Sequence, residues 1–409
     1  MKNKMKYIDL FAGCGGLSLG LHNSNLWEGV FAVEKNEDAF KTLKHNLIIE
    51  KKHFSWPPWL PMKNHDINHV LRNHKSDLLA LRNQIDLVTG GPPCQGFSSA
   101  GKRDESDSRN KLIKSYIRFI RLVQPKFLFF ENVKGFTQKF ENNKDKGLLY
   151  SKYVETELKK NSKYYGSLGY NVHGRLVNFA DFGIPQKRTR FILVGIRKDV
   201  TNIDPRDFFE KLKNNKFSFL KKKGLNSKTS LYEAISDLNG KNKVNYPNNF
   251  KYKTTKYNNI KSNYQKLMRR NTKRVFPDSH RLTNHKKETI LKFQLMLDEG
   301  EKNKPISTKL KRRLKTKKRT TIPTSKHEAC PSLTTLPDDF IHFDNARIFT
   351  VREYARIQSF DDWFEFKGKY TSGGKNRIND VPRYSQIGNA IPPLFGEQVG
   401  LIINDIIPK

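Results

Sequence analysis

The alternation of strand-like and helix-like patterns over the first 197 residues constrains the fold most strongly. Apolar runs typical of buried strands include 6–13 (KYIDLFAG), 84–91 (QIDLVTGG) and 126–133 (KFLFFENV). Between them lie segments with apolar residues at helical spacing, such as 111–124 (KLIKSYIRFIRLVQ). Because parallel strands need long crossover connections, this order predicts an α/β fold: a mostly parallel sheet with helices on both faces.

Residues 198–345 differ in composition. They are rich in Lys, Asn and Ser and contain basic clusters such as 309–319 (KLKRRLKTKKR). One amphipathic helix is visible at 230–238 (SLYEAISDL) and little else is regular. Interleaved Phe, Tyr and Leu favour a folded surface over a disordered basic linker. Further on, Thr350 and Glu353 predict the capping box of a helix in RIFTVREYARIQSF.

These patterns predict three parts. A first domain covers 1–197 and is completed by 385–409, a smaller basic domain covers 198–345, and a connecting region covers 346–384.

The net charge indicates a polyanionic partner. Lys and Arg number 77 against 40 Asp and Glu, a formal net charge of +37. A general bias toward Lys and Asn is the alternative, but it does not explain why acidic residues fall so far behind. Nucleic acid is therefore the expected partner.

The cysteines and the apolar runs indicate the cellular compartment of the protein. Cys14, Cys94 and Cys330 form neither a disulfide framework nor a cluster with metal-ligand spacing. No apolar run approaches membrane-spanning length, and the N-terminus shows no signal-peptide core. We expect an intracellular protein in a reducing compartment, with no metal and no membrane contact.

A glycine-rich loop follows the first expected strand. Gly13, Gly15 and Gly16 let the backbone approach a ligand at the carboxyl end of the strand, although their spacing is not that of a dinucleotide site. Glu34 ends the second strand, where an acidic side chain can bind ribose hydroxyls. With Asp66 available to an adenine amino group and Ile67 to its ring face, S-adenosylmethionine fits.

Cys94 stands in a stiff setting, TGGPPCQGFSSAGKR. Pro92 and Pro93 fix the chain after the QIDLV strand, so the thiol is expected at the rim of the sheet. A free cysteine is often only a small buried hydrophobe. The glycine- and serine-rich segment that follows can close over a substrate, and this makes Cys94 a candidate nucleophile.

A carboxyl and two arginines complete the candidate chemistry. Glu131 follows the apolar run FLFF, which suits a proton donor, although a helix-capping Glu is the alternative. Arg188 and Arg190 precede a strand, where either can hold a substrate oxygen, contact phosphate or remain a surface charge. A thiol, a carboxyl and an arginine beside this cofactor suit methylation of cytosine C5, with the base flipped out of the duplex.

These motifs resemble, in order, those of C5 cytosine-specific DNA methyltransferases of the bacterial restriction-modification type. The matching segments are DLFAGCGG, GGPPCQGFS, ENV, QKRTR, RIFTVREYARIQSF and QIGNAIPP. The resemblance implies a Rossmann-like, S-adenosylmethionine-dependent methyltransferase fold with a target-recognition domain at 198–345. It implies double-stranded DNA as partner, a monomer, a bacterial cytoplasm with nucleoid association through DNA, and work beside a cognate restriction endonuclease.

The resemblance also implies residue roles. Cys94 is the nucleophile, Glu131 contacts cytosine N3, and Arg190 holds the base with support from Arg188. The implied cofactor residues are Phe11 on the adenine, Glu34 on the ribose, Asp66 on the adenine amino group, and Asn389 in GNAIPP in a supporting position. The C-terminal helix is implied to pack back onto the first domain.

Two other functions remain open on sequence. A member that methylates transfer RNA shares the same chemistry, but its second domain is shorter than this one. A catalytically silent DNA-binding module on the same fold is a third possibility, because fold does not fix function. The joint presence of Cys94, Glu131 and Arg190 argues against it.

Overall fold

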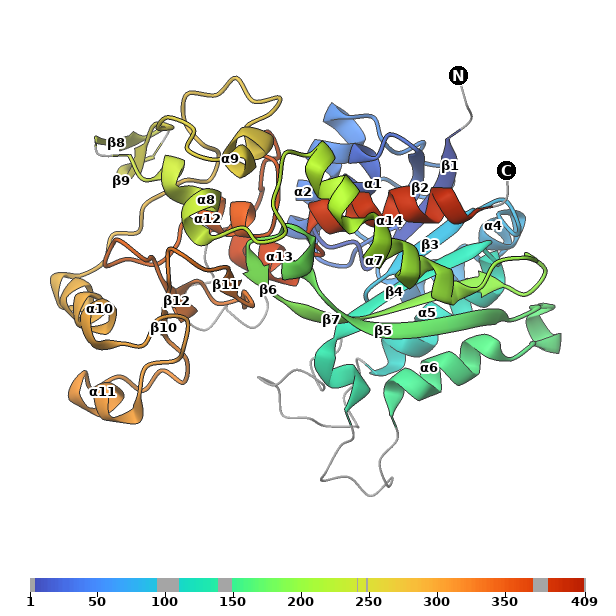
Figure 1. The fold of residues 1–409 in the computed structure, drawn as a ribbon. Helices are drawn as coiled ribbons and strands as arrows, with labels where there is room; N and C mark the ends of the chain where they lie inside the picture. The colour runs from blue at the N-terminus through green and yellow to red at the C-terminus, as the bar shows by residue number, and fades with distance from the viewer. Residues whose placement is uncertain are drawn as a thin grey trace. The chain divides into compact units, whose positions relative to one another are not determined.

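The computed structural model describes residues 4–93, 110–138, 149–240, 242–247, 249–370 and 382–407 (Figure 1). The chain divides into two compact units. Unit 1 is Met1–Asn178, Thr189–Lys216 and Phe395–Lys409, and unit 2 is Phe179–Arg188 and Phe217–Leu394. No helix in the described ranges is long and apolar enough to cross a membrane.

Unit 1 is built on a six-stranded sheet with the order β2-β1-β3-β4-β7-β5. Its strands are β1 (Met5–Leu10), β2 (Trp27–Val33), β3 (Leu87–Gly90), β4 (Phe127–Val133), β5 (Tyr170–Asn178) and β7 (Thr189–Arg197). The pairs among β2, β1, β3 and β4 are parallel, and β7 runs antiparallel to both β4 and β5. The predicted mostly parallel α/β sheet is confirmed.

Helices cover both faces of this sheet because its strands alternate apolar side chains to either side. Ile8, Leu10, Val88 and Phe130 belong to one apolar cluster that includes residues of the helices on their face. Those helices are α3 (Ile67–Asn73), α4 (Lys75–Ala80), α5 (Asn110–Val123) and α6 (Tyr150–Lys159). The ring of Phe129, which precedes Phe130 in β4 and points to the other face, contacts Phe208 of α7 (Pro205–Lys222) instead.

The C-terminal helix α14 (Pro393–Ile406) packs on the start of unit 1, as predicted. A Cβ atom on Gly20 of α1 (Gly16–Asn23) would lie 2.5 Å from backbone atoms of Gly396. The indole nitrogen of Trp27 donates to the carbonyl of Gly400 at 2.9 Å. Two glycine-lined helices thus approach backbone to backbone (Figure 1).

Unit 2 consists of short elements joined by long connections. Its helices are α8 (Leu231–Ile235), α9 (Asn263–Met268), α10 (Lys287–Glu299), α11 (Thr308–Arg313), α12 (Val351–Ile357) and α13 (Arg383–Asn389). Its strands are β6 (Gln186–Lys187), β8 (Lys243–Tyr246), β9 (Asn249–Thr255), β10 (Ile322–Pro323), β11 (Cys330–Pro331) and β12 (Phe340–Ile341). The predicted capping box of Thr350 and Glu353 is confirmed at the start of α12.

The expectation that little else is regular in 198–345 is wrong. α7 runs for 18 residues and α10 for 13. In α7 the buried residues Phe208, Leu212 and Phe219 recur at helical spacing, but Lys and Asn separate them and hide the pattern. The basic cluster at 309–319 is folded, because Leu310 and Leu314 are buried in a small apolar core with α10.

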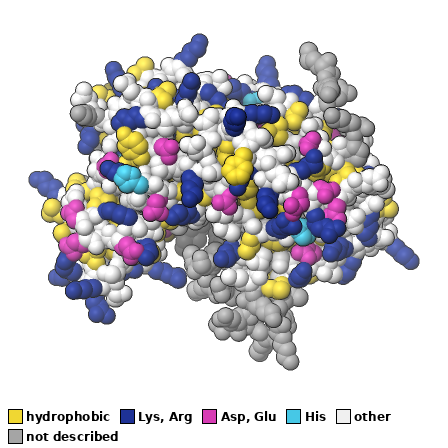
Figure 2. All heavy atoms as spheres, viewed as in Figure 1, with side chains coloured by type: hydrophobic (Ala, Val, Ile, Leu, Met, Phe, Trp, Pro, Cys, Tyr) yellow, Lys and Arg dark blue, Asp and Glu magenta, His cyan; other side chains and the backbone are white. Residues whose placement is uncertain are grey.

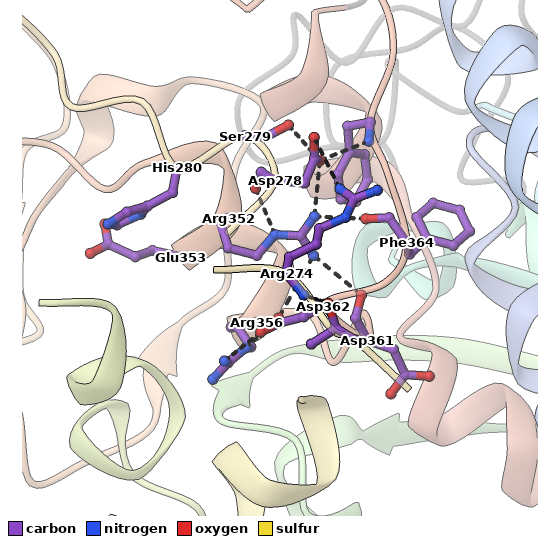
Figure 3. Close-up of polar contacts among 12 residues, drawn as sticks. Arg274, Asp278, Ser279, His280, Arg352, Glu353, Arg356, Asp361, Asp362 and Phe364 are labelled. Atoms are coloured by element: carbon purple, nitrogen blue, oxygen red, sulfur yellow. Dashed lines mark hydrogen bonds and ion pairs between the residues drawn. The ribbon is translucent and has the colours of Figure 1, made fainter. Parts of the chain in front are cut away.

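Two arginines of α12 are fully buried and hold unit 2 together. Arg356 forms a two-bond pair with Asp362 (2.5 and 2.6 Å) and another with Asp237 (both 3.2 Å). Arg352 pairs with Asp278 at 3.0 Å and lies 3.8 Å from Asp362. Planar guanidinium groups satisfy several carboxylates at once, and such pairing makes burial of charge tolerable (Figure 3).

We predict that Arg356→Ala destabilises the protein by about 3–5 kcal/mol, because Asp237 and Asp362 are left buried without their partner. Thermal unfolding of the full chain measures the loss. Arg312→Ala, which removes an exposed arginine of α11, is the control and should change stability by no more than about 0.5 kcal/mol. Equal melting temperatures for the two variants would contradict the importance of the buried cluster.

Candidate active site

The motif residues of unit 1 meet in one row at the carboxyl edge of the sheet. Strand register aligns Val33, Leu10, Gly90 and Phe130 across β2, β1, β3 and β4. The next residues along the chain are Glu34, Phe11 and Gly91, just past the ends of their strands, and Glu131, which still lies within β4. Neighbouring strands lie about 4.8 Å apart, so the row spans roughly 14 Å. Open α/β sheets bind ligands at this edge.

The glycine loop after β1 takes backbone conformations that favour glycine. Gly13 and Gly15 have φ values of 56° and 90°, and Phe11 between strand and loop has a φ of 58°. A Cβ atom on Gly13 would meet no atom of the described residues within 4 Å. The described residues therefore leave open space beside the loop. Gly15 caps the N-terminus of α1, which Gly16 begins.

Glu34 is fixed against this loop. Its carboxylate accepts hydrogen bonds from the backbone N–H groups of Gly13 at 2.9 Å and Asn36 at 2.7 Å. Burial raises the pKa of Glu34, and these backbone hydrogen bonds oppose the rise. A carboxylate has about four lone-pair directions, so each oxygen keeps acceptor capacity for a ligand hydroxyl.

Asp66 and Ile67 lie beside Glu34. The backbone N–H of His65 donates to the carbonyl of Glu34 at 2.8 Å, which brings the start of α3 to the loop. Asp66 caps α3 by accepting from the N–H of Asn68 at 2.8 Å, and its side chain remains one-third exposed. Ile67 is buried, so its apolar surface belongs to the core as well as to the edge of the site.

Asp9 is a buried carboxyl that sequence reasoning missed. It accepts from the hydroxyls of Ser18 at 2.5 Å and Thr89 at 2.9 Å, which ties β1, α1 and β3 together under the glycine loop. Burial raises the pKa of Asp9 from 3.8 to about 6. A single acidic residue within the apolar run YIDLF was the available signal.

Glu131 and Arg190 form an ion pair within unit 1. The Nε atom of Arg190 on β7 lies 2.9 Å from a carboxylate oxygen of Glu131 on β4, and both side chains are almost nine-tenths buried. Burial lowers the pKa of Arg190, and the charge of Glu131 opposes this. Glu131 lies inside a strand, so it is not a helix cap, and Arg190 is not a surface charge.

The segment that leads to Cys94 lies against this pair. A Cβ atom on Gly91 would lie 3.1 Å from the second carboxylate oxygen of Glu131. The side-chain amide of Asn132 donates to the carbonyl of Pro92 at 3.2 Å. Cys94 itself lies outside the described residues, but Pro93 before it is described.

Two predicted site residues belong to unit 2. Arg188 is buried and donates to the carbonyls of Leu333 at 3.2 Å and Gly388 at 2.8 Å, so it is not a surface charge. Asn389 ends α13 and is exposed. The other predicted residues with described positions come together in unit 1.

The described ranges contain no group of three or more His, Cys, Asp or Glu side chains placed to hold a metal ion. The polar groups at the sheet edge are instead carboxylates, backbone N–H groups and one guanidinium. Such groups suit an organic ligand with hydroxyl and amino functions.

Comparison with known proteins gives a consistent result. The model of the family C-5 cytosine-specific DNA methylase matches residues 5–404. Type II methyltransferase M.DdeI of Desulfomicrobium norvegicum is 30% identical over 410 residues, 96% of this chain and 87% of that protein. Type II methyltransferase M.Sau96I of Staphylococcus aureus is 30% identical over 407 residues, 98% of this chain and 76% of that protein.

A solved structure has the same fold. It is that of a prophage-encoded E. coli protein assigned as a DNA modification methyltransferase, with a TM-score of 0.68 and 22% sequence identity. The match covers 99% of this chain and 100% of the other.

We predict that Asp9→Asn changes how stability depends on pH. Between pH 3.8 and about 6 the folded protein holds a proton on Asp9 that the unfolded chain has released, so this group makes stability fall as the pH rises. The variant should lose this fall, a difference of up to about 3 kcal/mol above the raised pKa. Melting temperatures at a series of pH values measure it. Glu50→Gln, at an exposed carboxyl, should keep the wild-type profile.

Proposed function

Because the chain belongs to the C-5 cytosine-specific DNA methylase family, we propose that it methylates C5 of cytosine within a specific sequence of duplex DNA, with Cys94 as nucleophile. The observation that carries the proposal is the row of Glu34, Phe11, Gly91 and Glu131. One end of the row is built for a nucleoside-bearing ligand. The other end holds a carboxyl–guanidinium pair beside the segment that leads to the cysteine.

S-adenosylmethionine fits the first end of the row, where it would supply the methyl group. Glu34 keeps lone pairs for ribose hydroxyls, and Asp66 remains accessible to an adenine amino group. Phe11 offers a ring for the adenine, and Ile67 offers an apolar edge. The open space beside Gly13 leaves room for the ligand against the loop backbone.

Cys94 would begin the reaction by adding its thiolate to C6 of a flipped-out cytosine. This forms an S–C6 bond and moves an electron pair toward N3, so that C5 becomes a nucleophilic enamine carbon. After C5 is methylated, a solvent base removes the C5 proton and the S–C6 bond breaks to release the thiolate. Cysteine suits both steps because its thiolate is a strong nucleophile and a good leaving group.

Glu131 and Arg190 would stabilise the adduct. Once Glu131 has taken up a proton from solvent, it can donate that proton to N3 and so accommodate the electron pair, while Arg190 can hold O2 of the base. The ion pair between them fixes both groups before the base enters, which lowers the cost of reorganisation. Arg188 would support this arrangement from its own buried site.

Duplex DNA would be bound mainly through phosphate contacts and read by a target-recognition domain at residues 198–345. The excess of Lys and Arg matches the charge of the DNA backbone, and Figure 2 shows such side chains distributed over the viewed face. Flipping the base costs a few kcal/mol, which these contacts repay. A monomer that protects host DNA from a cognate restriction endonuclease is the corresponding biological role.

We predict that Cys94→Ser abolishes methyl transfer and leaves DNA binding largely intact, because a hydroxyl is far less nucleophilic than a thiolate. Transfer of labelled methyl from S-adenosylmethionine to plasmid DNA and, in parallel, to transfer RNA measures the activity. Bisulfite sequencing then locates 5-methylcytosine. Cys330→Ala, at a buried cysteine of unit 2, is the control and should remain active. Sustained turnover by Cys94→Ser would rule out the nucleophile, and label only in RNA would rule out the DNA substrate.

We predict that Glu131→Gln lowers the turnover rate by about 10²- to 10⁴-fold with little change in DNA affinity, because the amide cannot supply a proton to N3. Single-turnover kinetics with saturating DNA separates chemistry from binding. Glu157→Gln is the matched control, since Glu157 also pairs with an arginine, Arg121, at 3.0 Å in unit 1. A comparable loss in both variants would indicate a general structural effect.

A further inference from the structure

The segment around Arg281 in unit 2 is docked along strand β9. The backbone N–H of Leu282 donates to the carbonyl of Lys253 at 2.8 Å, and the side chain of Asn284 donates to the carbonyl of Lys251 at 2.6 Å. Leu282 is buried on one side of Arg281. Because both contacts are with backbone atoms of a paired strand, the position of this segment is well defined.

The other side of Arg281 is anchored by His280, which is fully buried. Its ring nitrogens lie 2.9 Å from the hydroxyl of Thr350 and 3.1 Å from the hydroxyl of Thr255. The hydroxyl of Thr254 donates to its carbonyl at 2.6 Å. Arg281 therefore lies between two buried neighbours that cannot shift easily.

Ser279 stores backbone strain just before this point. Its φ is 58°, a left-handed conformation that costs energy for a residue with a side chain. Arg352 donates a backbone hydrogen bond to its carbonyl and pairs with the adjacent Asp278, while Arg383 donates to its hydroxyl at 2.9 Å (Figure 3). The buried arginine cluster thus holds the turn that presents Arg281.

Two tyrosine rings clamp the guanidinium of Arg281. Its central carbon lies 3.9 Å from the ring centre of Tyr252 and 3.7 Å from that of Tyr370. Tyr370 is fixed in turn by a 2.5 Å hydroxyl contact with Tyr246 and by Arg383, 4.1 Å from its ring. Such stacking restrains the plane of the guanidinium and leaves its N–H edge to meet another group.

That edge has no partner within the described ranges of the chain. No hydrogen bond or ion pair joins Arg281 to any described residue, whereas the buried Arg352 and Arg356 are each satisfied several times over. A guanidinium held flat, partly exposed and without an acceptor is arranged for an acceptor from a ligand.

We propose that Arg281 reads a guanine of the recognised duplex by donating two hydrogen bonds to O6 and N7 in the major groove. This inference rests on the proposed function, since it requires DNA to reach unit 2. A fork of parallel N–H groups matches the two acceptors of guanine, and this is the commonest specific contact of arginine with DNA.

The surroundings favour a nucleic-acid ligand. The described residues between 242 and 257 include Lys243, Lys251, Lys253 and Lys256 but no Asp or Glu. These exposed lysines can bind phosphates on either side of the base, which positions the duplex without reading its sequence.

Selection from a pool of randomised duplexes tests the proposal with full-length protein, and it needs no catalysis. The wild type should enrich a short motif that contains guanine. Arg281→Lys keeps the charge and can keep the ring contacts but lacks the planar fork, so it should lose preference at one G·C pair and retain the rest of the motif. A wild-type protein that enriches no motif, or an Arg281→Lys variant with an unchanged motif, overturns the proposal.

Replacing the indicated guanine by 7-deazaguanine then distinguishes a contact of Arg281 with the base from a contact with phosphate. This change removes N7 and keeps O6, so it should weaken wild-type binding by about 2- to 13-fold, the net worth of one of the two hydrogen bonds. It should weaken Arg281→Lys less, because an ammonium lacks the planar fork that engages both acceptors. Arg312→Ala, which removes an exposed arginine of α11, is the control and should keep the full N7 effect. If 7-deazaguanine weakens binding by Arg281→Lys as much as binding by the wild type, Arg281 contacts a phosphate or has a structural role and does not read the base.

The methyl-transfer assay on the same proteins keeps the two proposals apart. A wild type that enriches a motif without methylating it contradicts the proposed function and leaves the assignment of Arg281 standing. A wild type that methylates one motif, together with an Arg281→Lys variant that methylates the same motif, contradicts the assignment of Arg281 alone. Melting curves for both proteins ensure that folded variants are compared.

Discussion

The hydrogen-bond register of four parallel strands is the constraint on which the candidate active site depends. Val33, Leu10, Gly90 and Phe130 lie in one line, so the residues that follow them emerge side by side. A slip by one residue in any strand would turn its side chains to the other face of the sheet. Asp9 also stabilises this register, because its carboxylate accepts hydrogen bonds from Thr89 of β3 and Ser18 of α1 and so joins both elements to β1.

Unit 2 is stabilised differently, since its described elements are short and its sheets have two strands each. Buried charge takes the place of a large sheet there: Arg352 and Arg356 satisfy carboxylates and carbonyls from segments far apart in the sequence. Burying such a cluster has a large desolvation free energy. It nevertheless fixes one arrangement of the segments, because a planar guanidinium can donate to its partners in few geometries. The strained turn at Ser279 is one arrangement that it holds, and Arg281 follows directly.

The sequence predicted unit 1 well because its strands are apolar, β-rich and separated by clear helical patterns. It predicted the glycine loop, Glu34, Asp66 and Glu131 as candidates because short motifs placed them at strand ends. It did not predict the helices α7 and α10, whose buried residues are separated by Lys and Asn. It also missed Asp9, since nothing local shows that a strand aspartate is buried and bonded to Ser18 and Thr89.

The sequence by itself therefore determined the fold class, the family motifs and the candidates for the reactive groups, because these are encoded in periodicity and short spacing. The tertiary structure alone decided which groups meet. It paired Glu131 with Arg190 across antiparallel strands, placed Gly91 and Pro92 against that pair, and sent Arg188 to carbonyls of unit 2. It also left the guanidinium of Arg281 stacked between rings, with no acceptor among the described residues. These outcomes depend on contacts between residues tens to hundreds of positions apart, which no local pattern specifies.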